Sequence, residues 1–303
     1  MSQIDVSVII VNYNTKDLLQ NCLRSIYEQT ASVTIEVLVS DNGSTDGSIE
    51  MIRQQFPQTI LLENNANLGF GKANNIAAKQ AHGKYIFYLN SDTELKNNAI
   101  KYFFDYWENA TEKNDIGALG CNLLNRNGDY MHSFAEFPAY KKMIYEPIRF
   151  FVTANIKCFF LLFFKQIPDF SSKIRHFEKY CGEVGYITGA DLFLYNDENA
   201  LFDERYFMYY EECDLELRLA HLGKKRIVID GPQIFHLENG SDKNKKGYSY
   251  SSIFNEISRI KYIRKNLRFQ FFIPFVKFFV ILTWLHPIIF PKTRSYFAEY
   301  LNS

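Results

Sequence analysis

The stretch VSVIIVNYN, residues 6–14, is a continuous apolar and β-branched run that ends in asparagine. Such a run predicts a strand buried on both faces, which is typical of a parallel sheet covered by helices. Apolar residues then recur at helical spacing between Leu18 and Ile26. A helix is therefore expected directly after the first strand.

The same order of strand, polar turn and helix recurs within about the first 110 residues. Further strands are expected at residues 35–40, 59–62 and 84–89, each followed by a turn rich in Asn, Asp or Gly and then by a helix. Repeats of this kind imply parallel strands joined by right-handed crossovers. The sequence predicts an α/β fold with a mostly parallel central sheet, helices on both faces, and a ligand site at the carboxyl edge of the strands.

Composition excludes several classes of protein. The 34 Lys and Arg residues balance the 34 Asp and Glu residues, so no overall field favours nucleic acid as a partner. Five scattered Cys without a CxxC spacing indicate a reducing compartment and no zinc site. The N-terminus lacks a basic region before its apolar run, so we expect no signal peptide and a cytoplasmic protein.

Acidic residues gather at three expected strand ends or helix starts. They are Asp41 in SDNGSTDGS, Asp92 in KYIFYLNSD, and the group Glu211, Glu212 and Asp214 in YYEECDLELR. Each has a plainer interpretation as a turn or as a helix start, and Asp46 is interpreted as a helix cap. Three clusters at one edge instead favour a divalent cation with an anionic ligand.

Four segments together resemble the family 2 glycosyltransferases, in particular the rhamnosyltransferase-like and galactofuranosyltransferase-like branch. These segments are VSVIIVNYNTKDLLQNCLRSI, VSDNGSTDGS, NLGFGKANNIAAKQAHGKYIFYLNSD and FDERYFMYYEECDLELRLAHLG. The resemblance covers roughly residues 5–240. It implies a glycosyltransferase A fold, which has a Rossmann-like sheet, and a nucleotide-diphosphate sugar as donor, with one bound Mn²⁺ or Mg²⁺ ion.

The resemblance also implies the donor and metal sites. The family's DxD motif is replaced here by Asn90, Ser91 and Asp92, so Asp92 is the expected metal ligand, with His236 as a second one. Further residues are expected to bind the nucleotide-sugar: Asn12, Asn14, Asp41, Lys72 and Asp191.

By the same resemblance, Glu212 takes the place of the acid that deprotonates the acceptor hydroxyl, where most relatives carry Asp. A general base must reach the attacking oxygen, and Glu is one methylene longer than Asp, so Asp214 and Glu211 stay as alternatives. The expected reaction is a one-step inverting displacement.

The resemblance implies that a sugar moves from dTDP-rhamnose or a UDP-sugar to a hydroxyl of a lipid-linked or polysaccharide acceptor in bacterial cell-surface glycan synthesis. Two alternatives are transfer to polyprenyl phosphate itself and a non-catalytic nucleotide-sugar-binding scaffold.

The domain expected at residues 1–240 is catalytic and contains an aromatic and basic insertion at 134–183. Residues 241–303 are expected to form a helical, aromatic-rich extension. The segments 149–165 and 269–290 carry Phe beside Lys or Arg, which is typical of interfacial membrane segments. We expect peripheral contact with the inner face of the cell membrane; an ordinary core or a homodimer interface is the alternative.

Overall fold

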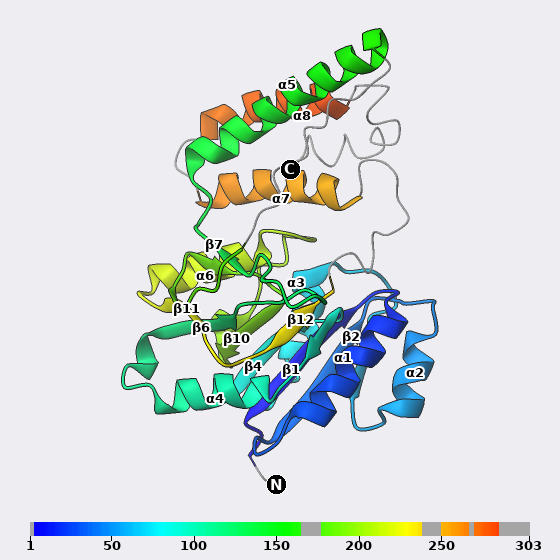
Figure 1. Cartoon of the computed structure of the whole chain (residues 1–303), viewed down its shortest axis with the longest axis vertical. Coiled ribbons are helices and arrows are strands. Elements are labelled where there is room, and N and C mark those ends of the chain that lie inside the picture. The colour runs from blue at the N-terminus through cyan, green and yellow to red at the C-terminus, as the bar shows by residue number, and fades with distance from the viewer. Residues whose placement is uncertain (1–2, 165–176, 238–249, 267–269, 285–303) are drawn as a thin grey trace. The chain divides into compact units, whose positions relative to one another are not determined.

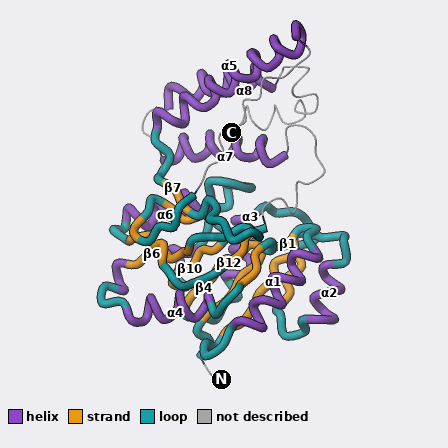
Figure 2. The backbone as a smooth tube through the Cα atoms, in the orientation of Figure 1, coloured by secondary structure: helices purple, strands orange, loops and turns teal. Residues whose placement is uncertain are grey.

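The computed structural model describes residues 3–164, 177–237, 250–266 and 270–284 (Figures 1 and 2). The chain divides into two compact units. The first unit comprises residues 1–137, 176–207 and 211–243, and the second comprises residues 138–175, 208–210 and 244–303.

The first unit is built on an eight-stranded sheet. In spatial order its strands are β3 (Ile60–Glu63), β2 (Ile35–Asp41), β1 (Val6–Asn12), β4 (Tyr85–Asn90), β10 (Asp191–Tyr195), β6 (Ile116–Cys121), β11 (Lys225–Ile229) and β8 (Gly182–Glu183). Pairs among β1 to β4 are parallel, as is the pair of β6 and β11, whereas β10 and β8 run antiparallel to their neighbours. The sheet is therefore mostly parallel, as the sequence predicts.

Helices cover both faces of this sheet. Alternate residues of β1 face opposite ways: Ile10 belongs to the core that contains Leu19 of α1 and Phe103 of α4, whereas Ile9 belongs to the core that contains Ala77 of α3 and Leu215 of α6. The helices of the unit are α1 (Lys16–Gln29), α2 (Ser48–Gln55), α3 (Phe70–Ala78), α4 (Ala99–Asn109) and α6 (Glu211–His221), with short 3₁₀ turns η1 (Lys113–Asp115) and η2 (Glu198–Ala200). The predicted α/β class with helices on both faces is confirmed.

Two small sheets fix segments beside the main one. Strand β12 (Ile234–His236) pairs antiparallel with β5 (Thr93–Leu95), which places His236 opposite Thr93. Strand β7 (Phe134–Ala135) pairs in the same way with β9 (Tyr186–Ile187). The first of these pairings carries a late segment of the chain to the end of β4.

The second unit is helical, with α5 (Tyr140–Phe164), α7 (Tyr250–Asn266), the turn η3 (Gln270–Phe272) and α8 (Ile273–Trp284). Helices α5 and α8 lie side by side, with the rings of Phe151 and Phe279 5.5 Å apart (Figure 1). The sequence-based division kept 134–183 within the catalytic domain and 241–303 apart, whereas α5 and the C-terminal helices α7 and α8 belong to one unit in the structure. Residues 165–176 and 285–303 lie outside the described residues. None of the described helices combines the length and apolarity needed to cross a membrane.

Candidate active site

A network of side-chain hydrogen bonds connects the carboxyl ends of β1, β2 and β4. The Asn12 amide donates to an oxygen of Asp41 at 2.7 Å, and its carbonyl oxygen accepts a hydrogen bond of 2.7 Å from the Thr15 hydroxyl. The Thr15 hydroxyl also lies 3.0 Å from that of Ser91. Three predicted site residues, Asn12, Asp41 and Ser91, are therefore brought to one edge of the sheet.

Asp41 is fully buried and shapes the turn after β2. Its Oδ1 accepts the backbone N–H groups of Gly43 at 3.0 Å and Ser44 at 2.7 Å. With the bond from Asn12, both carboxylate oxygens have partners, as a buried charge requires. Asp41 thus rigidifies the turn that borders the sheet edge.

Asn14 and Asp46 connect the same turn to the helices on either side. The Asn14 backbone N–H donates to the Ser44 hydroxyl at 2.9 Å, and its side-chain oxygen accepts from Thr45 N–H at 2.8 Å. Asp46 accepts the N–H of Lys16 at the start of α1 and that of Ser48 at the start of α2, at 2.8 and 3.1 Å. Asp46 therefore accepts the N–H of the first residue of both helices, although the N-cap positions themselves are Thr15 and Gly47.

The two predicted metal ligands are neighbours. His236 Nε2 lies 3.2 Å from Asp92 Oδ1, and the Asp92 carbonyl accepts the backbone N–H of Leu237 at 2.8 Å. Both side chains keep part of their surface exposed, 20% for Asp92 and 14% for His236. Carboxylate oxygen and imidazole nitrogen are a donor pair suited to manganese. Within the described parts of the chain no group of three or more His, Cys, Asp or Glu side chains is placed to hold a metal.

Asn90 connects the end of β4 to the antiparallel strand β10. Its backbone N–H donates to the carbonyl of Ala190 at 3.1 Å, and its carbonyl accepts the Thr93 hydroxyl at 2.7 Å. Its side chain is half-buried. The segment that enters β10 therefore lies directly beside the Asn-Ser-Asp turn.

The start of α3 lies against the chain that leads into α6. Gly69 has a φ of +85°, and a Cβ at this position would lie 2.2 Å from the carbonyl oxygen of Phe207. That oxygen accepts the N–H of Phe70 at 2.8 Å. Only glycine allows this approach. Lys72, two residues further on, is exposed on the first turn of α3.

Helix α6 begins with the acidic residues, which lie in unlike environments. Glu212 is half-buried. Its Cβ lies close to Gly189: a Cβ added to that glycine would be 3.8 Å from the Cβ of Glu212. Burial raises the pKa of Glu212 to about 6. Glu211 is buried, and so is Asp214, whose Oδ1 accepts the Tyr206 hydroxyl at 3.2 Å. Of the three candidate bases, Glu212 therefore combines some exposure with an environment that favours proton uptake.

Asp191 lies at the start of β10, fully buried rather than at the surface of the site. Its Oδ2 accepts the backbone N–H of Cys121 at 2.7 Å. Burial raises the pKa of Asp191 to about 7. The structure places this predicted ligand contact behind the sheet edge, where it ties β10 to β6.

Glu216 is a buried acid beside the candidate base that the sequence reasoning missed. It follows Glu212 by one helical turn, is fully buried, and accepts the N–H of Ile187 with both carboxylate oxygens, at 3.0 and 2.9 Å. Burial raises the pKa of Glu216 well above its usual value, and the charge of Glu212 raises it further. The signal was an acid between the apolar residues Leu215 and Leu219.

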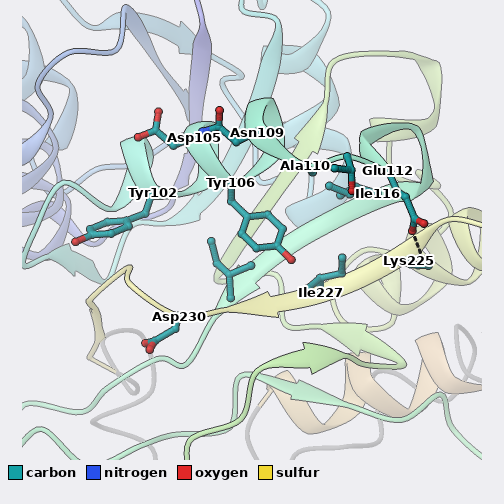
Figure 3. A pocket seen from close by; sticks show the side chains of 12 residues that line it. Tyr102, Asp105, Tyr106, Asn109, Ala110, Glu112, Ile116, Lys225, Ile227 and Asp230 are labelled. Atoms are coloured by element: carbon teal, nitrogen blue, oxygen red, sulfur yellow. Dashed lines mark hydrogen bonds and ion pairs between the residues drawn. The ribbon is translucent and has the colours of Figure 1, made fainter.

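A separate groove of about 700 Å³ lies between α4 and β11 (Figure 3). Tyr102 and Tyr106 project over it from α4, and Asp230 lies at the end of β11. None of the predicted site residues lines this groove.

The mostly parallel sheet with helices on both faces is a glycosyltransferase A fold. The solved structure of the mannosyltransferase PcManGT from Pyrobaculum calidifontis has this fold and superposes with a TM-score of 0.54 at 17% identity, covering 100% of this chain and 76% of that one. The sequence profile described as glycosyl transferase family 2 matches residues 7–168. The chain belongs to this family, whose members are inverting glycosyltransferases.

Curated relatives agree with that assignment. The chain is 26% identical over 244 residues to the N-acetylglucosaminyl-diphospho-decaprenol L-rhamnosyltransferase of Mycobacterium tuberculosis, covering 76% of this chain and 75% of the relative. It is 34% identical over 122 residues to the UDP-Glc:alpha-D-GlcNAc-diphosphoundecaprenol beta-1,3-glucosyltransferase WfaP of Escherichia coli, covering 37% of this chain and 48% of that protein. The predicted membership of family 2 and the similarity to rhamnosyltransferases are confirmed.

Proposed function

We propose that this chain transfers a hexose from a nucleotide-diphosphate donor, dTDP-rhamnose or a UDP-sugar, to a hydroxyl of a lipid-linked glycan, with inversion at the anomeric carbon. One observation carries the proposal. Asn90 is hydrogen-bonded to Ala190, and the preceding Gly189 faces Glu212. The turn that contains Asp92 and the candidate base therefore border the same short segment, 189–190.

The donor half of the site would be the edge formed by β1, β2 and β4. The turn held by Asp41 presents backbone groups and the amide of Asn14 beside α1, and Asn90 and Ser91 lie next to Asp92. Lys72 is exposed on the first turn of α3, where a cation suits a diphosphate. Asp191 would act indirectly, because its burial keeps it from the ligand.

Asp92 and His236 would hold a divalent ion, since their oxygen and nitrogen donors are already adjacent. The PcManGT structure was solved in complex with GDP-Man and Mn²⁺, and the ion proposed here is Mn²⁺ or Mg²⁺. When bound, such an ion stabilises the negative charge that develops on a departing diphosphate. The two side chains also fix each other's orientation before any ligand arrives.

Glu212 would act as the general base. With its pKa near 6 it is ionised at neutral pH and still accepts a proton readily. The acceptor O–H bond breaks and its proton moves to Glu212. The oxygen then forms a bond to the anomeric carbon as the bond from that carbon to the diphosphate oxygen breaks, and the electron pair leaves with the diphosphate.

The acceptor is inferred from the relatives' names, which specify decaprenol- and undecaprenol-diphosphate sugars. An acceptor of this kind lies in a membrane. We therefore place the protein in the cytoplasm, in peripheral contact with the inner face of the cell membrane.

Calorimetry of nucleotide-sugars with and without Mn²⁺, followed by transfer assays with the donor that binds, tests this function. Asp92→Ala and His236→Ala should each lose the Mn²⁺-dependent part of donor binding, whereas Asp105→Ala, an exposed acid on α4, should bind like the parent chain. Donor binding without transfer or hydrolysis would instead indicate a binding scaffold. Unchanged Mn²⁺ dependence in Asp92→Ala would refute the metal assignment.

A further inference from the structure

The helical segment formed by η3 and α8 exposes three phenylalanines, Phe271 on η3 and Phe275 and Phe278 on α8. Phe271, Phe275 and Phe278 are 69%, 45% and 55% exposed. Their spacing of four and three residues places them along one side of a helical segment. Side chains of this size are rarely exposed in a row on a protein whose surface meets only water.

The opposite face of the same helix is packed. Ile273, Val276 and Val280 are buried. Phe279, whose ring lies 4.7 Å from that of Phe275, packs on Phe151 of α5 at a ring separation of 5.5 Å. Figure 1 shows α5 and α8 running along each other. Phe275 and Phe278 are therefore held on a helix that is packed on its other side, rather than on a loop that could turn them inward.

Basic residues gather in this part of the sequence. Residues 257–298 contain eight Lys or Arg and no Asp or Glu, in a chain that is neutral overall. Of these, Arg264 and Lys265 are exposed at the last turn of α7, directly before the phenylalanines in the chain. Two exposed cationic side chains therefore precede the exposed aromatic face.

We propose that the face formed by Phe271, Phe275 and Phe278, together with Arg264 and Lys265, docks on the surface of an anionic lipid bilayer. The phenylalanine rings enter the boundary between headgroups and acyl chains, and the basic side chains contact lipid phosphates. A second copy of this chain is a poorer occupant, because like charges would then face each other. The inference builds on the proposed lipid-linked acceptor and names the surface that reaches it.

Flotation with vesicles tests the surface directly. The full chain should float with vesicles that contain anionic phosphatidylglycerol at low salt, and floatation should weaken with pure phosphatidylcholine or with added salt. Phe275→Glu and Phe278→Glu should each lower the bound fraction by about tenfold or more. Tyr106→Glu is the matched control, since it also places Glu at an exposed aromatic, on α4 of the first unit (Figure 3), and should float like the parent.

A second variant combines Arg264→Gln with Lys265→Gln and leaves the packing of α8 untouched. It should reduce binding to anionic vesicles but not to vesicles of pure phosphatidylcholine. A chain that stays at the bottom of the gradient, or that floats equally well with every variant, overturns the proposal. So does a dimer, detected by light scattering, that Phe275→Glu dissociates. Mn²⁺-dependent donor binding should be unchanged in all these variants; its absence from the parent chain would count against the proposed function rather than against the docking surface.

Discussion

Two groups of carboxylates in this molecule have opposite environments. Asp41 and Asp46, at the turn after β2, accept hydrogen bonds from backbone N–H groups of turns and helix starts. Glu212 and Glu216, on α6, lie one turn apart, and burial raises the pKa of each. The first arrangement favours a fixed charge that builds the site, and the second favours a group that can take up a proton. The candidate site thus contains structural carboxylates, Asp41 and Asp46, and carboxylates that can take up a proton, Glu212 and Glu216.

The largest expected effect is a loss of transfer rate when Glu212 is replaced. Glu212→Gln should lower the rate of transfer by about 100-fold or more, because a general base of this kind contributes about that factor, while calorimetry should find donor binding unchanged. Glu198→Gln, which alters an exposed acid on η2, serves as the control. Near-normal turnover in Glu212→Gln would transfer the role to Glu211 or Asp214 and weaken the contrast.

The second expected effect is a loss of stability when Asp41 is replaced. Asp41→Ala removes an acceptor from three donors, one buried and two part-buried, so the free energy of unfolding should fall by about 3 kcal/mol. Glu63→Ala is a matched control, because Glu63 lies opposite Asp41 on β3 but forms only an exposed ion pair with Arg53; its cost should be less than about 1 kcal/mol. Urea denaturation measures both. Equal losses would show that Asp41 is no more structural than a surface acid.

The smallest expected effect is on the pH dependence of stability, to which Glu212 and Asp46 should contribute with opposite signs. The folded protein holds the Glu212 proton more tightly than the unfolded chain, so this group's contribution to stability falls as pH rises from 4.5 to about 6. For Asp46, the effect of partial burial is outweighed by hydrogen bonds from Ser48 and Lys16, which lower its pKa. Its contribution is present above pH 3.8 and is lost as pH falls below that value.

Unfolding curves at several pH values separate these contributions. Glu212→Gln should flatten the decline between pH 4.5 and about 6, and Asp46→Asn should reduce stability at neutral pH more than at pH 3. If both substitutions changed the profile in the same direction, the two environments would not differ as described.

The sequence predicted most of the fold because its signals are local. Continuous apolar runs such as residues 6–11 and 85–89 could only be buried strands, and each ended in the polar residues that now border the site. The antiparallel direction of β10 was not predictable, since strand direction depends on neighbours that are far away in the chain. The union of α5 with α8 was hidden for the same reason: apolar faces do not specify their partners.

The candidate site was predictable only in part. Asn12, Asp41 and Asp92 lie at strand ends, which sequence patterns locate well. The burial of Asp191 could not be foreseen, because it depends on β6 lying beside β10. Glu216 escaped notice because one acid among leucines gives no indication that its partner is a backbone N–H from β9.

The contact between Asp92 and His236 also constrains how the protein is made. Asp92 leaves the ribosome early, whereas His236 follows about 140 residues later, after all the strands of the main sheet. The pair forms only when β12 has docked on β5. A chain that ends before residue 236 has only half of this pair, so the pair requires a segment that follows every strand of the main sheet in the sequence.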